Sequence, residues 1–201
     1  MPSRRRALAC LVRKEFFELF SSRAFWVMLL LTGPLVGVSF ISAVTAYGEL
    51  SAAGGSGAGV GEAFSPLIGV FGPTFSAYEI VAAFLLPFVA IRMVSADRMS
   101  GAAKLEAQQP LSALARVSIK ALVLLAGWML SALPGVLALI LWRSYGGSIH
   151  MPEIAAIVLG HLLNAGLTVA LAACAASVAE HPATAAILTL AFTVGTWVLD
   201  F

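Results

Sequence analysis

Charged residues are scarce in this sequence of 201 residues. Only 11% of them are Asp, Glu, Lys or Arg, whereas 60% are hydrophobic. A soluble domain usually has about 25% charged and about 45–50% apolar residues. The composition therefore excludes an ordinary soluble globular protein and indicates an integral membrane protein.

The sequence also lacks the motifs of familiar catalytic and metal sites. Its two cysteines, Cys10 and Cys174, are far apart, so we expect reduced thiols and no disulfide framework. The three histidines, His150, His161 and His181, fall on alternating sides of the membrane or within it and do not make one metal site. Walker A, HExxH and GxSxG motifs are absent. We therefore predict a chain that is not an enzyme, binds no metal or cofactor, and has no nucleic-acid partner.

Long apolar runs dominate what is present. A spanning helix needs roughly 20 mostly apolar residues, and irregular backbone is excluded from lipid. We predict an all-α polytopic transmembrane bundle, one domain over 1–201, with about five spans. These are Ala24–Tyr47, Thr74–Val94, Ala121–Trp142, Ile154–Ala179 and the shorter Ala183–Leu199. A flexible loop is predicted between the first two spans, because the run at 53–61 is rich in glycine and lacks the ending of a phosphate-binding loop.

Basic residues are distributed unequally between the two predicted sides of the membrane. Six precede the first span and five lie at or between the second and third spans, whereas only Arg143 falls on the other side. Cytoplasmic loops carry the excess of Lys and Arg. The N-terminus and the segment after the second span are therefore predicted to be cytoplasmic.

The segment before the first span has the pattern of an amphipathic helix. Its apolar face is formed at helical spacing by Leu8, Val12, Phe16, Leu19 and Phe20. Glu15 lies at the edge of this face and weakens the pattern. Such a basic helix favours the anionic inner leaflet. The alternative is a plain basic flank before the first span.

The polar segment between the second and third spans is longer than a simple chain reversal requires. Gly101 permits backbone geometry that other residues resist, and Pro110 ends the short helix expected over 102–109. Ser112 can cap the helix that Ala113–Lys120 carries into the membrane. We predict a short helix on the inner surface that transmits a push from a soluble partner; the alternative is an ordinary cytoplasmic loop.

This segment resembles the coupling segment of the type-2 ABC transporter permeases. That family carries Glu-Arg-x-x-Gly-Thr after the second helix, then a Pro-hydrophobic-Ser step and a Gly-Lys pair. The corresponding residues here are Asp97-Arg98-x-x-Gly101-Ala102, Pro110-Leu111-Ser112 and Ile119-Lys120. The opening Val12-Arg13-Lys14-Glu15-Phe16, with Ser22-Arg23, resembles the family's elbow helix. The spacing is most similar to the gliding-motility and copper-enzyme-maturation branch.

The resemblance implies the permease subunit of an ABC exporter in the bacterial cytoplasmic membrane. It implies a second permease subunit as partner and ATPase subunits that hold ATP and Mg²⁺. The residues expected to couple the chain to the ATPase are Asp97, Arg98, Gly101, Pro110, Ser112 and Lys120. Because the family generally has six spans, we also expect a sixth helix beyond Phe201.

Polar residues inside the spans are the candidates for a translocation path. His161, Asn164 and Thr168 share one helix face, and Glu79 lies at the outer end of the second span. These residues line a path, or they merely bridge helices or reach the headgroups. Two other functions remain open: an ion-coupled transporter or channel using Glu79 and His161, and a non-transporting scaffold or sensor. Small residues in the third span predict close helix packing: Gly127, Ser131 and Gly135.

Overall fold

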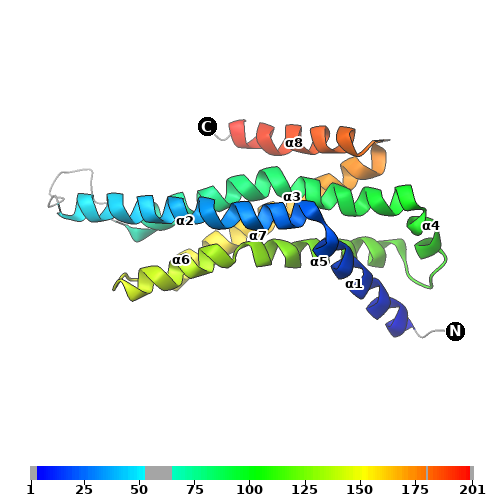
Figure 1. Ribbon diagram of the computed structural model, residues 1–201, viewed down its shortest axis with the longest axis horizontal. Helices are drawn as coiled ribbons and strands as arrows, with labels where there is room; N and C mark the ends of the chain where they lie inside the picture. Colours follow the sequence, from blue (N-terminus) through cyan, green and yellow to red (C-terminus); the bar gives the residue numbers. More distant parts are fainter. Residues whose placement is uncertain (1–3, 53–64, 180, 200–201) are drawn as a thin grey trace. The chain divides into compact units, whose positions relative to one another are not determined.

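The computed structural model describes residues 4–52, 65–179 and 181–199, which form helices joined by short turns (Figure 1). Within these ranges there is no strand, as the sequence predicted. The elements are α1 (Arg4–Ser21), α2 (Arg23–Ala52), η1 (Leu67–Phe71), α3 (Gly72–Ser100), α4 (Ala102–Ala107), α5 (Ala113–Ser131), α6 (Leu133–Ser144), α7 (Met151–Val178) and α8 (Pro182–Leu199). The predicted glycine-rich loop at 53–61 lies outside the described residues.

Four helical segments are long and apolar enough to cross a membrane. They are Arg23–Ala52, Leu67–Ser95, Ala113–Ser144 and Met151–Val178. In α8 the apolar part that the structure describes, Pro182–Gly195, is shorter than a span. By length and composition the chain is a multi-pass membrane protein. The fifth predicted span stays a prediction.

The second span begins earlier than the sequence predicted. It starts at Leu67, because the π-helical turn η1 leads directly into α3. Pro73 has no amide to donate, and it lies where the π-helical turn η1 joins α3. At about 1.5 Å per residue, Glu79 lies about 18 Å from Leu67. The position of Glu79 relative to the membrane surface stays a prediction.

The third span is interrupted near its middle. α5 ends at Ser131 and α6 begins at Leu133, with Pro134 in the first turn of α6. Proline cannot donate the backbone hydrogen bond that a continuous helix needs there. Pro134 is thus found beside a break between two helices.

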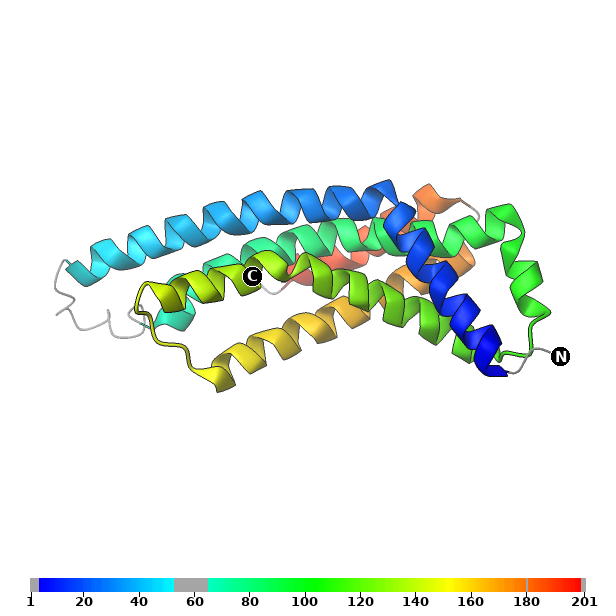
Figure 2. The same ribbon diagram turned by 60° about the horizontal axis from the view of Figure 1, so that its bottom comes forward.

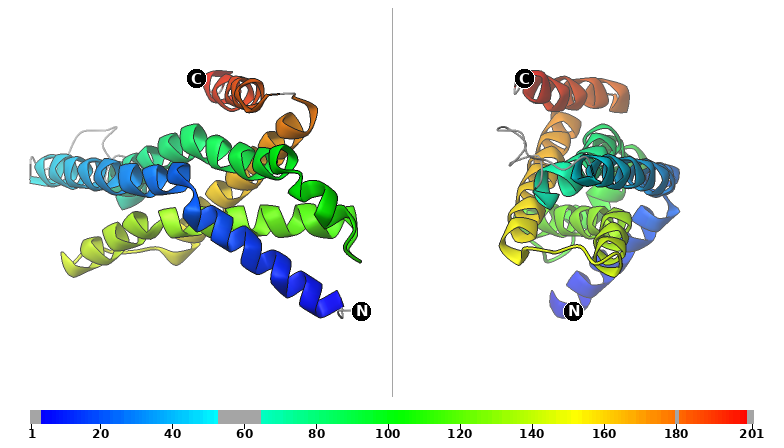
Figure 3. Two further views of the ribbon diagram at one scale, coloured as in Figure 1. Left: turned by 45° about the vertical axis from the view of Figure 1, so that its right-hand side comes forward. Right: turned by 90° about the vertical axis from the view of Figure 1, so that its left-hand side faces the viewer.

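The chain divides into two compact units. Unit 1 consists of residues 1–28, 82–129 and 162–201, and unit 2 of residues 29–81 and 130–161. In unit 2 the buried core contains Phe40, Val70, Phe71, Phe75, Ala138, Trp142 and Ile154. Also in unit 2, the turn after α6 leads into α7 (Figure 3).

In unit 1, α1 lies beside α5 (Figure 2). Its buried stripe is Ala7, Leu11, Glu15 and Leu19. The first three each lie one position before a residue of the predicted apolar face, and Leu19 belongs to both sets. Phe20, which the prediction placed on that face, is 42% exposed. Glu15 therefore does not lie at the edge of the buried face but in its centre.

Small residues allow close helix contacts in both units, as predicted. In unit 1 a Cβ at Gly127 of α5 would lie 2.7 Å from Leu19 Cδ2 and 3.2 Å from Phe25 Cε2. In unit 2 a Cβ at Gly135 would lie 3.1 Å from Phe75 Cε1. Only glycine accommodates such close contacts without displacing a neighbour.

Candidate functional site

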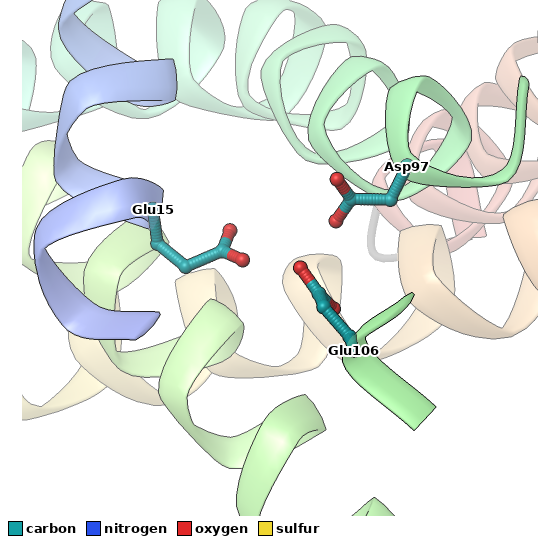
Figure 4. A group of neighbouring side chains, drawn as sticks. All are labelled: Glu15, Asp97 and Glu106. Atoms are coloured by element: carbon teal, nitrogen blue, oxygen red, sulfur yellow. The ribbon is translucent and has the colours of Figure 1, made fainter. Parts of the chain in front are cut away.

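A cluster of charged side chains joins four helices of unit 1. α1 contributes Lys14, Glu15 and Glu18, α3 contributes Asp97, α4 contributes Glu106 and α5 contributes Lys120; we call these six residues the charge cluster. The carboxylates of Glu15, Asp97 and Glu106 point toward one another (Figure 4). The cluster lies where the polar segment after α3 meets the N-terminal helix.

Two lysines connect the carboxylates. Lys14 Nζ lies 2.6 Å from Asp97 Oδ1 and 2.5 Å from Glu106 Oε1. Lys120 Nζ lies 2.5 Å from Glu15 Oε1 and also donates to Asp97. Asp97 thus bridges both lysines, one with each carboxylate oxygen.

Most of the cluster is hidden from solvent. The side chains of Glu15, Asp97 and Glu106 are 0%, 5% and 9% exposed, and that of Lys120 is 14% exposed. Charges in such surroundings interact much more strongly than charges in water, but their removal from water is costly. The cluster is therefore a rigid link only as long as each charge keeps its partner.

In this environment the pKa of Glu15 and the pKa of Asp97 shift in opposite directions. Burial raises the pKa of Asp97, but hydrogen bonds from Lys120 and Lys14 outweigh it and hold that pKa below its ordinary value of 3.8. For Glu15, burial dominates and raises the pKa above 4.5, although Lys120 partly opposes it. Glu15 Oε2 is buried and has no hydrogen-bond partner among the described residues, whereas both oxygens of Asp97 are paired.

The charges of the cluster do not balance. Four carboxyl groups face two ammonium groups, so one protonated carboxyl would reduce the excess of negative charge. Lys14 is well suited to stay charged: burial lowers its pKa, but hydrogen bonds to Asp97 and Glu106 more than compensate and raise it. Of the two central carboxyl groups, Glu15 is therefore the one that takes up a proton more readily.

Carboxylate oxygens of Glu15, Asp97 and Glu106 lie within 4.8 Å of one another, a spacing that could suit a hard metal ion. The lysine nitrogens, however, already occupy the positions that a cation would need, at 2.5–2.6 Å from these oxygens. We therefore interpret the cluster as an ion-pair network.

The turns around α4 have the geometry that the sequence predicted. Gly101 has φ +76°, a left-handed conformation that glycine adopts readily, and it separates α3 from α4. Ser112 Oγ accepts a hydrogen bond from the backbone N–H of Ala115 at 3.2 Å and so caps α5. Arg116 donates to the backbone oxygens of Glu106 and Leu111 and holds this turn against α5.

The predicted coupling residues therefore fall into two groups. Asp97 and Lys120 come together inside the cluster, so their side chains are not an external surface. Gly101, Pro110 and Ser112 shape the surface turns on either side of α4, with Pro110 and Ser112 exposed. The side chain of Arg98 lies outside the described part of the chain.

Sequence reasoning missed Glu15 and Glu106 as partners of Lys14 and Lys120. Lys14 and Glu106 are 92 residues apart, and no local pattern reveals such a contact. One signal was available for Glu15, which is four residues from both Leu11 and Leu19 and therefore lies on the buried stripe of α1.

A second pair of ionisable residues lies in unit 2. His161 Nδ1 is 4.0 Å from Glu79 Oε2, which brings together two of the predicted path residues. The other two path residues, Asn164 and Thr168, belong to unit 1. Asn164 is exposed and Thr168 is 3% exposed, so the predicted polar face of α7 is not uniform in burial.

The fold and these sites together define a class, the multi-pass helical membrane proteins. Comparison of the chain with protein-family models, with curated proteins and with solved structures gives no match. Any narrower assignment depends on the residues themselves.

Proposed function

We propose that this chain is the permease subunit of an ABC-2-type exporter, coupled through α4 to a separate ATPase subunit. The observation that supports this most is the position of the charge cluster. It connects α1 to α3, α4 and α5 at the segment whose sequence resembles the family's coupling segment.

The cluster gives a physical route for coupling. Glu106 lies on α4 and is held by Lys14 of α1, while Asp97 at the end of α3 is held by lysines of α1 and α5. Separating buried, paired charges is costly, so a displacement of α4 should move the ends of the neighbouring helices with it. Asp97 and Lys120 would then transmit motion inside the permease, without contacting the ATPase themselves.

The contact with the ATPase would be made by the outer side of α4 and its turns. Leu105 is 67% exposed, and Lys104, Gln108, Gln109 and Pro110 are also exposed. A mixed surface of this kind, with one apolar side chain among polar ones, is typical of the contact areas between soluble proteins. ATP and Mg²⁺ would be bound by the ATPase, and a second permease subunit would complete the transporter.

The N-terminal helix would act as the elbow helix, lying at the inner surface of the bacterial cytoplasmic membrane. Its exposed side carries Arg5, Arg6 and Arg13 together with Phe17, which is 74% exposed. Aromatic and basic side chains on one helix favour the headgroup region of anionic lipid. α8 would serve as a fifth span, and polar residues of α3 and α7 would contribute to the path.

Site-specific photo-crosslinking in native membranes tests this function. A photoreactive amino acid replaces Leu105 on α4 in the tagged full-length chain, and a matched chain carries it at Leu137 of α6, which is 59% exposed. We expect an ATPase subunit with a Walker A motif to be captured at position 105 and not at 137. Intact chain in the membrane without any ATPase at position 105 would refute the proposal.

A further inference from the structure

Glu79 and His161 lie at depths where ionisable groups are costly. Glu79 is about 18 Å along its span from Leu67, and His161 is about 15 Å along α7 from Met151. If the hydrocarbon core of a bilayer, about 30 Å thick, is centred on these two helices, both side chains start from positions inside it. Ionisable residues at such depth are rare, and they pair with one another or mark ion and proton pathways.

One acidic and two aromatic side chains of α3 surround the imidazole of His161. The carboxylate of Glu79 lies 4.0 Å from Nδ1. The rings of Phe75 and Tyr78 have centroids 5.8 Å from that of the imidazole, at interplanar angles of 36° and 79°. All three neighbours come from two successive turns of α3. The imidazole thus has one carboxylate and two aromatic rings of α3 as neighbours.

The other charged side chains that the structure describes in unit 2 lie at the ends of their helices and are not counter-ions of His161. Those that the structure describes are Glu49 on α2, Arg143 on α6 and Glu153 on α7, and each lies in an end turn of its helix. The Tyr78 hydroxyl, which is the nearest other titratable group on α3, is within hydrogen-bond distance of Ser131 Oγ, at 3.3 Å. Among the described charges, Glu79 is therefore the counter-ion within reach of His161.

We propose that Glu79 and His161 form a proton-binding site inside the membrane-spanning part of unit 2. The pair holds one proton, which resides either on the imidazole, giving an ion pair, or on the carboxyl, giving two neutral groups. In a poorly polar environment both states avoid an isolated charge on the imidazole. The site requires no ATPase, so it stands or falls independently of the proposed function.

The test is a proton titration of His161 by NMR in the purified full-length chain in lipid nanodiscs. Replacing His150 and His181 by Gln leaves His161 as the only histidine to carry the isotope label. The comparison is between Glu79→Gln and the matched control Glu153→Gln, which removes the same charge from the first turn of α7. A carboxylate about 4 Å away changes the proton affinity of an imidazole at least tenfold at an intermediate dielectric constant.

We expect Glu79→Gln to weaken proton binding at His161 at least tenfold and Glu153→Gln to leave it nearly unchanged. Glu79→Asp, which withdraws the carboxylate by one methylene group, should give an intermediate loss and provides a second variant if Glu79→Gln does not fold. Equal titration in the Glu79 and Glu153 variants would overturn the proposal. So would a His161 in the unmodified chain that takes up no proton between pH 4 and pH 9.

Discussion

Glu15 and Asp97 show how two neighbouring carboxyl groups acquire different roles. Both are buried and both contact Lys120, but only Asp97 has each oxygen paired with an ammonium group. The unpaired Oε2 of Glu15 leaves burial as the dominant influence on that residue. Asp97 is therefore the carboxylate that the cluster needs in its charged form, and Glu15 is the one that tolerates protonation.

Neutral substitutions should separate the two roles. Asp97→Asn removes the bridge between Lys14 and Lys120, and breaking a buried pair of this kind costs about 3 kcal/mol. Glu15→Gln should cost much less at pH 7, because it removes a charge that burial already disfavours. Thermal unfolding of the two variants in the same detergent measures the difference, and equal destabilisation would contradict the assignment.

The pH dependence of the folding stability follows from the pKa shifts of Glu15 and Asp97. The raised pKa of Glu15 means that charged Glu15 costs stability at neutral pH, and this cost is relieved as the pH falls through the raised pKa toward 4.5. Asp97 contributes stability above pH 3.8, which is lost only below that value because its folded-state pKa is lowered. As the pH falls from 7 toward 4.5, the unmodified chain should therefore gain stability relative to Glu15→Gln.

At the scale of helices, the packing of α1 on α5 depends on Gly127. A side chain at this position meets Leu19, which is fully buried and has little room to move. Gly127→Leu should destabilise the protein by about 1–3 kcal/mol, the usual cost of overpacking a well-filled core. Gly160→Leu in α7 is the matched control, because a Cβ there has no neighbour within 4 Å. Equal unfolding temperatures of the two variants would show that this contact is not formed.

Local chemistry allowed the sequence to predict several elements closely. Gly101, Ser112 and the apolar runs act through their own backbone or through neighbours a few residues away, so α4, the cap of α5 and four spans were found. The start of the second span was missed because Pro73 was interpreted as part of a loop, whereas the helix begins before it with the π-helical turn η1.

Contacts between distant parts of the chain could not be predicted in this way. Lys120 meets Glu15 across 105 residues and Lys14 meets Glu106 across 92, so the charge cluster exists only once four helices have packed. Glu79 and His161 were both singled out as polar residues in spans, but the sequence alone did not pair them by distance.

At the scale of the whole molecule, the proposed function requires α4 to face the cytoplasm. Cys10 and Cys174 are exposed and are replaced by serine before labelling. A cysteine introduced at Ser148, in the turn after α6, should then react with a membrane-impermeant thiol reagent in intact cells. One introduced at Lys104 of α4 should react only after the membrane is opened, because the excess of basic residues places it inside. Reversed labelling would exclude docking of a cytoplasmic ATPase on α4.

The central claim is that the charge cluster makes α1 and α4 move as one body. Spin labels on Cys10, an exposed native cysteine of α1, and on a cysteine replacing Lys104 of α4 report this distance directly by pulsed EPR in the full-length chain with Cys174→Ser. We predict a narrow distance distribution in this chain and a broad one after Lys14→Met and Glu106→Gln, because the ion pair that joins α1 to α4 is then absent. An equally narrow distribution in both chains would contradict the claim.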